Sequence, residues 1–341
     1  MTDLPTSLDD RPAARPAEAG AGKRPADATH EVSSSAALVS VVIPCFNYAH
    51  FLDQAIQSAV DQDYPAIEVI VVNDGSTDDP AAIVSRFPHV RYVTQENRGL
   101  AAARNVGLSH CRGELVVFLD ADDRLRPGAI AAGARLLEAN PDLGFAAGFS
   151  TLISGVGLAQ PTVNRPGCEG SDAYMSLLRR NTIRNPGTVL FRRQLVEAAG
   201  GFTSGVDACA DYDLYLRISR NHPVVFHDAV VAEYRKHGHN MSDNSAQMLR
   251  QALAVLRRQR PHLVTRELRH AYRDGTRNIR IYYGDELVTQ IRSRIRRRSE
   301  WWQLLRDLAV LSWYHPCGAM EEAGRKIATL WKGRDATGPV M

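Results

Sequence analysis

The stretch VFLDADD, residues 117–123, places three aspartates directly after an apolar run. Asp120, Asp122 and Asp123 cannot all be buried without a counter-charge, because an unpaired carboxylate loses several kcal/mol of hydration free energy. Hard divalent cations prefer oxygen ligands, and Mg²⁺ or Mn²⁺ typically takes one or two carboxylates together with substrate phosphates. The stretch therefore predicts a divalent-cation site at the end of a strand. An acidic surface turn is the alternative interpretation.

Two further apolar runs also end in polar residues. The residues PCFN (44–47) follow one run, and NDGSTDD (73–79) follows another. The second stretch alone fits a strand-to-helix turn equally well, because Gly75 permits a tight turn and the residues after it can cap a helix. Three separate strand ends with ligand-type residues nevertheless favour one shared binding site.

The elements that must position these residues follow from the hydrophobic pattern between residues 38 and 125. Strand patterns cover 38–44, 67–74, 90–95 and 114–120, and helical patterns cover 50–62, 79–87 and 99–110. Continuous apolar strands that alternate with helices indicate a parallel sheet covered on both faces. Such sheets bind ligands beyond the carboxyl ends of their strands, which is where the polar residues gather.

The rest of the chain predicts three regions. Residues 1–37 are rich in Ala, Pro, Asp and Ser, and we expect a disordered leader because they cannot bury enough apolar surface. The middle segment mixes strand patterns (143–153, 187–193, 224–235) with helical ones (172–180, 210–221). From about residue 244 the pattern is helical. We therefore expect a leader at 1–37, an α/β domain at 38–240 and a helical C-terminal region at 241–341.

Composition narrows the class of protein. The formal net charge is +3 over 341 residues, which is too balanced to indicate a nucleic-acid partner. The five cysteines are scattered without a CxxC pair, so we expect free thiols: Cys45, Cys111, Cys168, Cys209 and Cys317. The sequence shows neither a signal peptide nor an apolar run of roughly 18 residues. We expect a cytoplasmic location, with peripheral attachment to the inner face of the membrane as a refinement.

The first strand lacks GxGxxG, and GxxxxGK[ST] is also missing, which argues against a dinucleotide fold and a P-loop.

A basic and aromatic segment lies near the C-terminus, at residues 291–315. Five arginines fall within 292–298, next to an apolar set: Trp301, Trp302, Leu304, Leu305, Leu308, Leu311 and Trp313. Basic residues beside such a set predict a helix that lies on an anionic membrane surface. The alternative is a helix that packs on the core and exposes its arginines. A nucleic-acid partner is not expected, because the rest of the chain has no matching pattern.

Five stretches in order resemble the family 2 glycosyltransferases with the GT-A fold: VSVVIPCFN, VVNDGSTDD, NRGLAAARNVG, VFLDADD and DYDLYLRISR. TVLFRR and AGGF also resemble that family, and the likeness covers roughly 38–240. It implies an α/β, Rossmann-like, mostly parallel sheet flanked by helices, with a helical C-terminal extension. It also implies an inverting hexosyltransferase that depends on Mn²⁺ or Mg²⁺ and acts in bacterial surface-polysaccharide or glycan synthesis. The implied partners are a nucleoside-diphosphate sugar, with a UDP-sugar favoured, and a saccharide or lipid-linked acceptor.

The resemblance also implies roles for individual residues. Pro44, Phe46 and Asn47 match the first nucleotide-binding turn, Asp74 the residue that contacts the base, and Arg104 a residue near the nucleotide. Asp120 matches a ribose contact, Asp122 a metal ligand, His237 a contact to the metal or diphosphate, and Asp211 the catalytic base. Asp123 is expected to serve local structure. From the residues alone, Asp211 could instead cap a helix, and His237 could be a polar loop residue.

One departure and two alternatives remain. The family usually has Glu-Asp where this chain has Ala210-Asp211, which leaves the acceptor type and the rate uncertain. A nucleotide-sugar-binding protein without catalysis is therefore one alternative. The other is a haloacid-dehalogenase-like phosphatase, whose strand also ends in DxD. There a Thr or Val usually follows after one spacer, whereas Asp123-Arg124 follows here.

Overall fold

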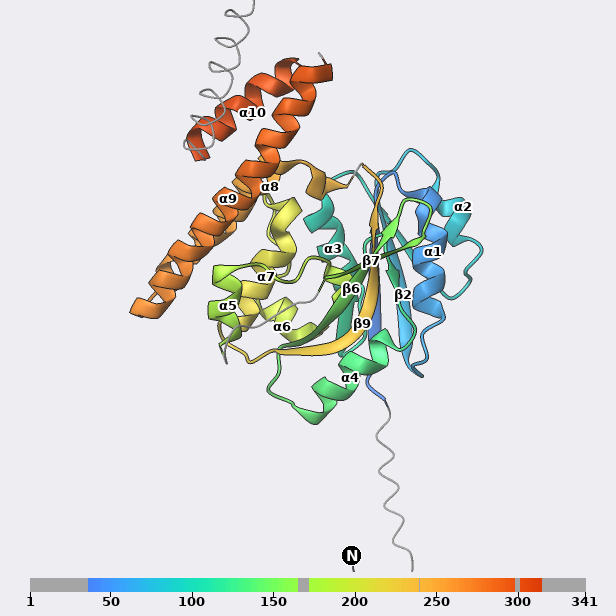
Figure 1. The fold of residues 1–341 in the computed structure, drawn as a ribbon. Helices are drawn as coiled ribbons and strands as arrows, with labels where there is room; N and C mark the ends of the chain where they lie inside the picture. The colour runs from blue at the N-terminus through green and yellow to red at the C-terminus, as the bar shows by residue number, and fades with distance from the viewer. Residues whose placement is uncertain (1–35, 165–171, 239, 298–300, 315–341) are drawn as a thin grey trace, which may run out of the picture. The chain divides into compact units, whose positions relative to one another are not determined.

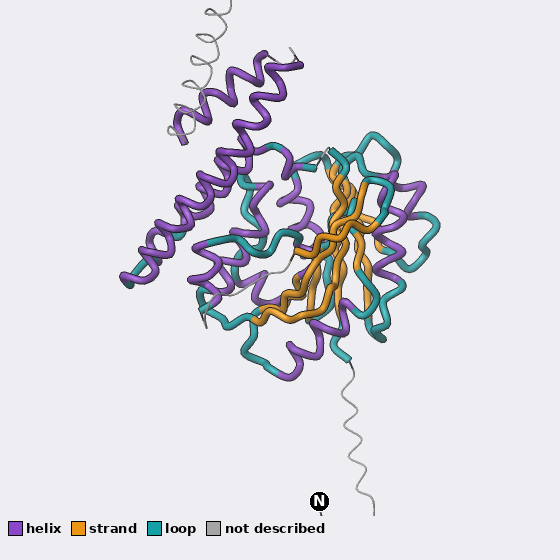
Figure 2. Tube along the Cα trace, in the orientation of Figure 1, coloured by secondary structure: helices purple, strands orange, loops and turns teal. Residues whose placement is uncertain are grey.

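The computed structural model describes residues 36–164, 172–238, 240–297 and 301–314. Within these residues the strands form one mixed sheet in the order β3-β2-β1-β4-β8-β6-β9-β5, and β7 pairs with β6. Figure 2 shows this sheet as one twisted layer with helices on both sides. Most of the leader predicted at 1–37 lies outside the described residues, as do Cys168 and Cys317.

The first half of the sheet is parallel, as the sequence predicts. It consists of β1 (Val39–Cys45), β2 (Ile67–Asp74), β3 (Arg91–Gln95) and β4 (Leu115–Phe118). The helices between them are α1 (Ala49–Val60), α2 (Pro80–Val84) and α3 (Leu100–Ser109). Every residue of β1 is buried, and its alternate side chains enter two different cores. The continuous apolar run of this strand therefore reflects burial on both faces.

The second half of the sheet is mixed, which the alternating pattern did not predict. Its strands are β5 (Arg124–Leu125), β6 (Phe145–Ser154), β7 (Ala159–Asn164), β8 (Val189–Arg192) and β9 (Val225–Lys236). Its helices are α4 (Ala129–Ala139), α5 (Ala173–Arg179), α6 (Arg193–Ala198) and α7 (Ala210–Ser219). Strand β8 runs antiparallel to both β4 and β6, while β9 runs parallel to β6. The short strand β5 and the helices α4 and α6 were not expected from the sequence.

Three helices follow β9: α8 (Ser245–Arg258), α9 (Arg266–Arg297) and α10 (Trp301–Tyr314). The first part of α9 packs closely on α5, because a Cβ added at Gly275 would lie 1.9 Å from the carbonyl oxygen of Leu178. Buried residues of α8 and α9 belong to the same apolar core as α5 and α7. Figure 1 shows α9 crossing the molecule beside α5, α7 and α8.

The segment predicted at 291–315 is divided between the end of α9 and α10, and residues 298–300 and 315 lie outside the described part. Leu304 and Leu311 of α10 are buried, whereas Trp302 and Trp313 are 82% and 79% exposed. One face of α10 therefore packs on the core and the opposite face meets solvent. Among the described residues, none of the helices has both the length and the apolar character that a membrane span requires. The described cysteines Cys45, Cys111 and Cys209 are free thiols.

Candidate active site

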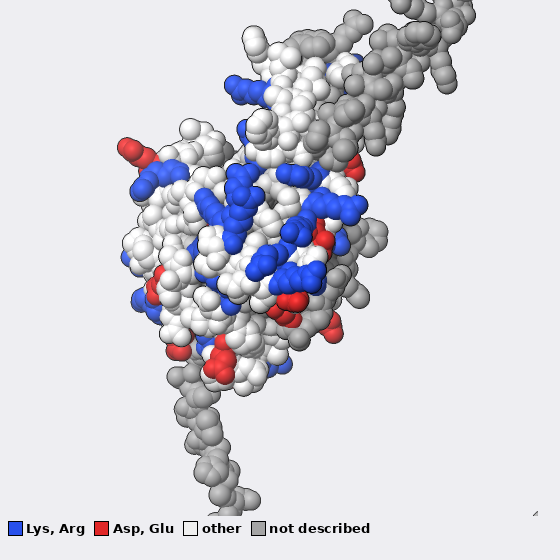
Figure 3. Space-filling model, turned by 90° about the vertical axis from the view of Figure 1, so that its left-hand side faces the viewer, with Lys and Arg blue, Asp and Glu red and all other residues white. Residues whose placement is uncertain are grey.

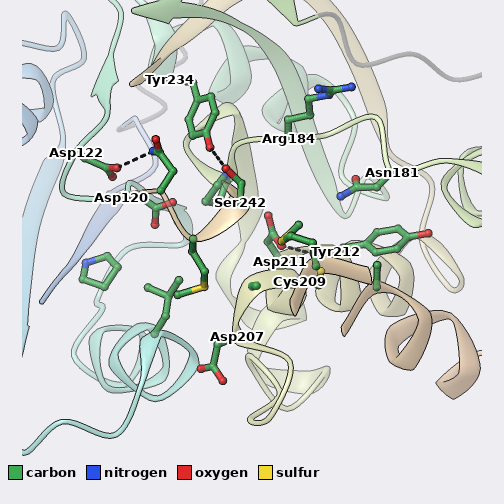
Figure 4. Close-up of a pocket in the computed structure, with 18 of the residues that line it drawn as sticks. Asp120, Asp122, Asn181, Arg184, Asp207, Cys209, Asp211, Tyr212, Tyr234 and Ser242 are labelled. Atoms are coloured by element: carbon green, nitrogen blue, oxygen red, sulfur yellow. Dashed lines mark hydrogen bonds between the residues drawn. The ribbon is translucent and has the colours of Figure 1, made fainter. Parts of the chain in front are cut away.

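The carboxyl ends of β1, β2 and β4 open into a cleft of about 1560 Å³. The cleft is lined by all nine residues proposed from the sequence: Pro44, Phe46, Asn47, Asp74, Arg104, Asp120, Asp122, Asp211 and His237. The ends of strands and the turns after them, helix α3, the first turn of α7 and the segment after β9 supply these side chains from distant parts of the chain. Figure 4 shows part of the cleft, with Asp120 and Asp122 on one side and Asp211 on another.

The turn after β1 and the turn after β2 hold each other in place. Asn47 has a positive φ of 57°, which asparagine tolerates better than most residues. Its side-chain oxygen accepts a hydrogen bond from the backbone N–H of Thr77 at 2.9 Å, and its own N–H donates to Ser76 Oγ at 3.1 Å. Asp78 accepts from the N–H of Ala49 at 2.8 Å. Asn47 therefore shapes this edge of the cleft, and the neighbouring Phe46 ring is exposed to it.

Asp74 ends β2 and orders the loop before α3. Its carboxylate accepts hydrogen bonds from Gln95 Nε2 at 2.6 Å, from the N–H of Arg98 at 2.9 Å and from the N–H of Gly99 at 3.0 Å. The side chain is buried at the cleft wall. A structural role for Asp74 therefore accompanies the nucleotide contact predicted for it.

Asp120 and Asp122 have different counter-groups. The buried Arg104 donates from Nη2 to Asp120 Oδ1 at 2.7 Å. Asp122 Oδ2 lies 2.9 Å from His237 Nε2. Burial raises the pKa of Asp120, Arg104 opposes this rise, and the neighbouring Asp122 adds to it. The structure therefore brings Arg104 and His237, both singled out from the sequence, directly to these two carboxylates.

The third aspartate faces away from the cleft and is held by groups that the sequence did not reveal. Asp123 accepts from Asn185 Nδ2 at 2.7 Å and from the backbone N–H of Arg235 at 2.8 Å. The guanidinium of Arg235, which is 1% exposed, donates to the carbonyl oxygen of Asp122 at 2.7 Å and lies over the ring of Phe51. Burial and the two neighbouring aspartates raise the pKa of Asp123 well above its ordinary value. Arg235 is a basic residue within the strand β9, and this position was the sequence signal that could have identified it.

Asp211 lies in the first turn of α7, but it is not the N-cap, because Cys209 occupies that position without a side-chain cap. Burial raises the pKa of Asp211 to about 6, against the opposing effect of Arg104 and of the hydrogen bond from the Tyr212 N–H. At neutral pH the side chain is therefore a carboxylate that is more basic than an ordinary aspartate. That property suits a general base.

The far end of the cleft is formed by the segment after α5 and by α9. Asn181 and Arg184 line it from the first, and Tyr282 and Glu286 line it from the second. Figure 4 shows Asn181 and Arg184 beyond Asp211. These residues carried no motif, so the sequence did not predict them. Another residue that the sequence missed is Asp207, whose Oδ1 accepts from the N–H of Ala101 at 3.1 Å in the first turn of α3.

A divalent cation is compatible with the residues at the strand end. No group of three or more His, Cys, Asp or Glu side chains that could hold a metal occurs in the described ranges. Asp122 and His237 do lie side by side on the cleft wall, and Asn240 Nδ2 approaches Asp122 Oδ2 at 3.4 Å. Mg²⁺ and Mn²⁺ commonly take only one or two protein carboxylates when substrate phosphates supply further oxygens. The pair therefore fits a site that a bound diphosphate completes.

Comparison with known proteins agrees with this geometry. The family model "Glycosyl transferase family 2" matches residues 40–200. A chondroitin synthase of Escherichia coli is 28% identical over 214 residues, which is 60% of this chain but only 30% of that protein. An uncharacterized protein of Mycobacterium tuberculosis is 31% identical over 254 residues, which is 69% of this chain and 78% of the relative.

Two solved structures share the fold. Staphylococcus aureus TarS 1–349 in complex with UDP-GlcNAc has a TM-score of 0.56, with 16% identity over 81% of this chain and 80% of that one. The mannosyltransferase PcManGT from Pyrobaculum calidifontis, in complex with GDP-Man and Mn²⁺, has a TM-score of 0.54 and 22% identity over 88% of each chain. The protein therefore belongs to glycosyl transferase family 2, a family of glycosyltransferase enzymes.

Proposed function

We propose that the protein transfers a sugar from a nucleoside-diphosphate sugar to an acceptor hydroxyl, with inversion at the anomeric carbon. The observation that carries this proposal is the cleft itself, which joins the strand-end carboxylates Asp120 and Asp122 to Asp211. Asp211 is a partly buried carboxylate whose pKa of about 6 suits a base at neutral pH. The carboxylates that we assign to the donor and the proposed proton acceptor therefore line the same cleft.

The donor would bind along the strand ends. Pro44, Phe46 and Asn47 form the wall for the nucleotide, and Asp74 stands beside them at the end of β2. Asp120 is assigned to the ribose, and Arg104 holds this carboxylate in position from behind. The role of Arg104 is therefore to orient Asp120, since its Nη2 already donates to that residue.

Asp122 and His237 would hold Mn²⁺ or Mg²⁺ next to the diphosphate. When bound, such a cation stabilises the negative charge that develops on the leaving phosphate oxygens. Asn240 donates to the carbonyl oxygen of Arg235 at 2.8 Å and its amide also approaches Asp122, so it steadies the loop that carries His237. The chain itself supplies the orientation of both ligands.

The transfer step is assigned to Asp211. Its carboxylate takes the proton of the acceptor hydroxyl while the acceptor oxygen bonds to the anomeric carbon and the bond to the diphosphate breaks. The anomeric carbon passes through an oxocarbenium-like state. The acceptor would approach from the end of the cleft lined by Asn181, Arg184 and Tyr282, because Asp211 lies between that end and the strand ends. A single displacement of this kind inverts the anomeric configuration.

The relatives support a hexosyltransferase but leave the sugar open, because the bound donors named for the two solved structures are UDP-GlcNAc and GDP-Man. We favour a UDP-sugar as donor and a saccharide or lipid-linked acceptor. The proposed setting is the synthesis of a bacterial surface polysaccharide or glycan, at the cytoplasmic side of the membrane.

A second candidate function is nucleotide-sugar binding without transfer. It rests on Ala210, which stands where the family usually has glutamate and is fully buried in the apolar core. A carboxylate group is therefore missing next to Asp211, and the acceptor could be held differently or not at all. The phosphatase alternative has lost its support, since the chain belongs to glycosyl transferase family 2.

The experiment that separates these functions is a donor screen with two readouts. Thermal stabilisation by each nucleotide sugar, with and without Mn²⁺, reports donor binding. Release of the nucleoside diphosphate, with and without candidate acceptors, reports transfer or hydrolysis. Binding together with release supports the transferase, and binding without release from any donor and acceptor supports the binding protein.

A further inference from the structure

An arginine stripe runs along the exposed face of α9. We use this name for Arg266, Arg269, Arg273, Arg277 and Arg280, all of which are exposed. Their spacing of three or four residues places them on one face of the helix. The opposite face, which includes Ala271 and Gly275, is buried against the core. The stripe therefore points away from the body of the protein.

These cations are not used to hold the fold together. Arg269 donates to the carbonyl oxygens of Leu263 at 3.1 Å and Val264 at 2.9 Å. The other four arginines of the stripe form no ion pair with a carboxylate of the described residues. Figure 3, which views the molecule from the side of α9, shows Lys and Arg side chains gathered on this face. Their charge is available to an anionic partner.

The same face of α9 changes character toward its C-terminal end, where α10 packs on it. Leu287, Val288 and Ile291 continue the spacing of the stripe, and they are buried in one apolar cluster with Leu304 and Leu311 of α10. The same cluster contains Ala246, Leu249 and Leu253 of α8, so α8 and α10 both pack on this part of α9. Figure 1 shows α10 farther from the sheet than α9. Helix α10 therefore packs on α9 just beyond the C-terminal end of the arginine stripe, and its other face is exposed.

The outer face of α10 carries two tryptophans. Trp302 and Trp313 are exposed on the side opposite the buried Leu304 and Leu311, and Leu305 and Leu308 are exposed on the flank of the helix. Tryptophan and leucine side chains partition favourably into the boundary between lipid headgroups and acyl chains. Arginine side chains are attracted electrostatically to anionic headgroups. A nucleic acid would use the arginines but would gain little from exposed leucines. A second copy of the chain in symmetric contact would bring one arginine stripe against another.

We propose that the arginine stripe of α9 and the outer face of α10 together dock the protein on an anionic lipid bilayer. Helix α9 also forms part of the cleft wall, because its residues Asn278 and Ile281 line the cleft. Docking would therefore hold the acceptor end of the cleft at the lipid headgroups. This last consequence rests on the proposed function and favours a lipid-linked acceptor, whereas docking itself does not depend on it.

Vesicle flotation tests the docking directly and needs neither donor nor acceptor. The full chain is mixed with phosphatidylcholine vesicles, with or without phosphatidylglycerol. We expect binding to the anionic vesicles, weaker binding at high salt and little binding to phosphatidylcholine alone. Each basic residue near an anionic surface strengthens partitioning about fivefold, so Arg273→Gln/Arg277→Gln should weaken it about 25-fold. Trp302→Ser/Trp313→Ser should also lower the bound fraction.

The matched control is Arg91→Gln/Arg135→Gln, which removes the same charge from exposed positions on β3 and α4. This control should float like the unmodified chain. Absence of flotation with anionic vesicles would overturn the proposal, as would equal flotation of the stripe variant and the control variant. Capture of an RNA oligonucleotide without any vesicle binding would assign the stripe to nucleic acid and would also overturn it.

Discussion

Replacing Asp211 by asparagine should separate donor binding from sugar transfer. Asparagine has nearly the same size, and its side-chain oxygen can still accept the hydrogen bond from the N–H of Tyr212, so the first turn of α7 should persist. It cannot accept a proton at neutral pH. General-base catalysis contributes about 10²–10⁴-fold, so we expect turnover to fall by that factor, or about 3–5 kcal/mol in the barrier. The affinity for the nucleoside diphosphate should not change.

The pH dependence provides a second, independent readout of the same variant. Because burial raises the pKa of Asp211 to about 6, kcat/KM of the unmodified enzyme should rise about tenfold per pH unit below pH 6 and level off above it. The residual activity of Asp211→Asn should lack this inflection.

The free energy of unfolding should also depend on the ionisation of Asp211. An aspartate whose folded pKa is raised favours the folded state in its protonated form, and this contribution disappears as pH rises through about 6. A rise of about two pKa units corresponds to about 3 kcal/mol at most. Asp211→Asn should therefore gain stability relative to the unmodified protein between pH 4 and pH 7, as measured by urea unfolding.

Turnover of Asp211→Asn is measured as release of the nucleoside diphosphate at a saturating donor concentration. Nucleotide binding is measured separately by calorimetry. The matched control is Asp172→Asn, which makes the same chemical change at the exposed N-cap of α5, where asparagine caps equally well. This control should retain full activity. Unchanged turnover in Asp211→Asn would remove Asp211 from the mechanism, and loss of nucleotide affinity would show that its main role is in donor binding.

Three further substitutions test other parts of the account. Asp122→Asn should lose nearly all metal-dependent donor binding, and unchanged affinity and metal dependence in calorimetry would refute its assignment as a ligand. Arg104→Met should lower the free energy of unfolding, measured in urea, by about 2–3 kcal/mol. This loss is smaller than for a fully buried ion pair, because the side chain of Asp120 is 26% exposed. Stability equal to that of the unmodified protein would show that this ion pair contributes little. Gly107→Ala should cost about 1–3 kcal/mol, since the added Cβ would lie 2.3 Å from Val42 Cγ1, and an unchanged urea midpoint would contradict that close packing.

The sequence predicted the parallel half of the sheet because its strands are buried on both faces and therefore read as continuous apolar runs. It also predicted that Asp74 and Asp120 share an edge, since the carboxyl ends of parallel strands lie together. The mixed half was not predicted. Strand β5 has only two residues, and its pairing with β9 joins Arg124 to Glu233, a contact that no local pattern encodes.

The residues that contact the aspartates of the stretch 117–123 were also predicted only in part from the sequence. The DxD spacing and the family resemblance singled out Asp122 and His237 as candidates, and the structure brings Oδ2 of Asp122 to 2.9 Å from Nε2 of His237. Asn185 and Arg235, which hold Asp123, belong to no recognised motif and are more than sixty residues away in the chain. Contacts of this kind depend on the packing of distant strands, so they could be read only from the fold.

The most direct test of the proposed transfer is a panel of nucleotide sugars incubated with the protein and Mn²⁺, with the released nucleoside diphosphate measured by chromatography. The account predicts release from at least one donor by the unmodified protein, and loss of that release in both Asp122→Asn and Asp211→Asn. No release from any donor with any acceptor, or release by either variant equal to that of the unmodified protein, would contradict the assignment of this cleft as the site of transfer.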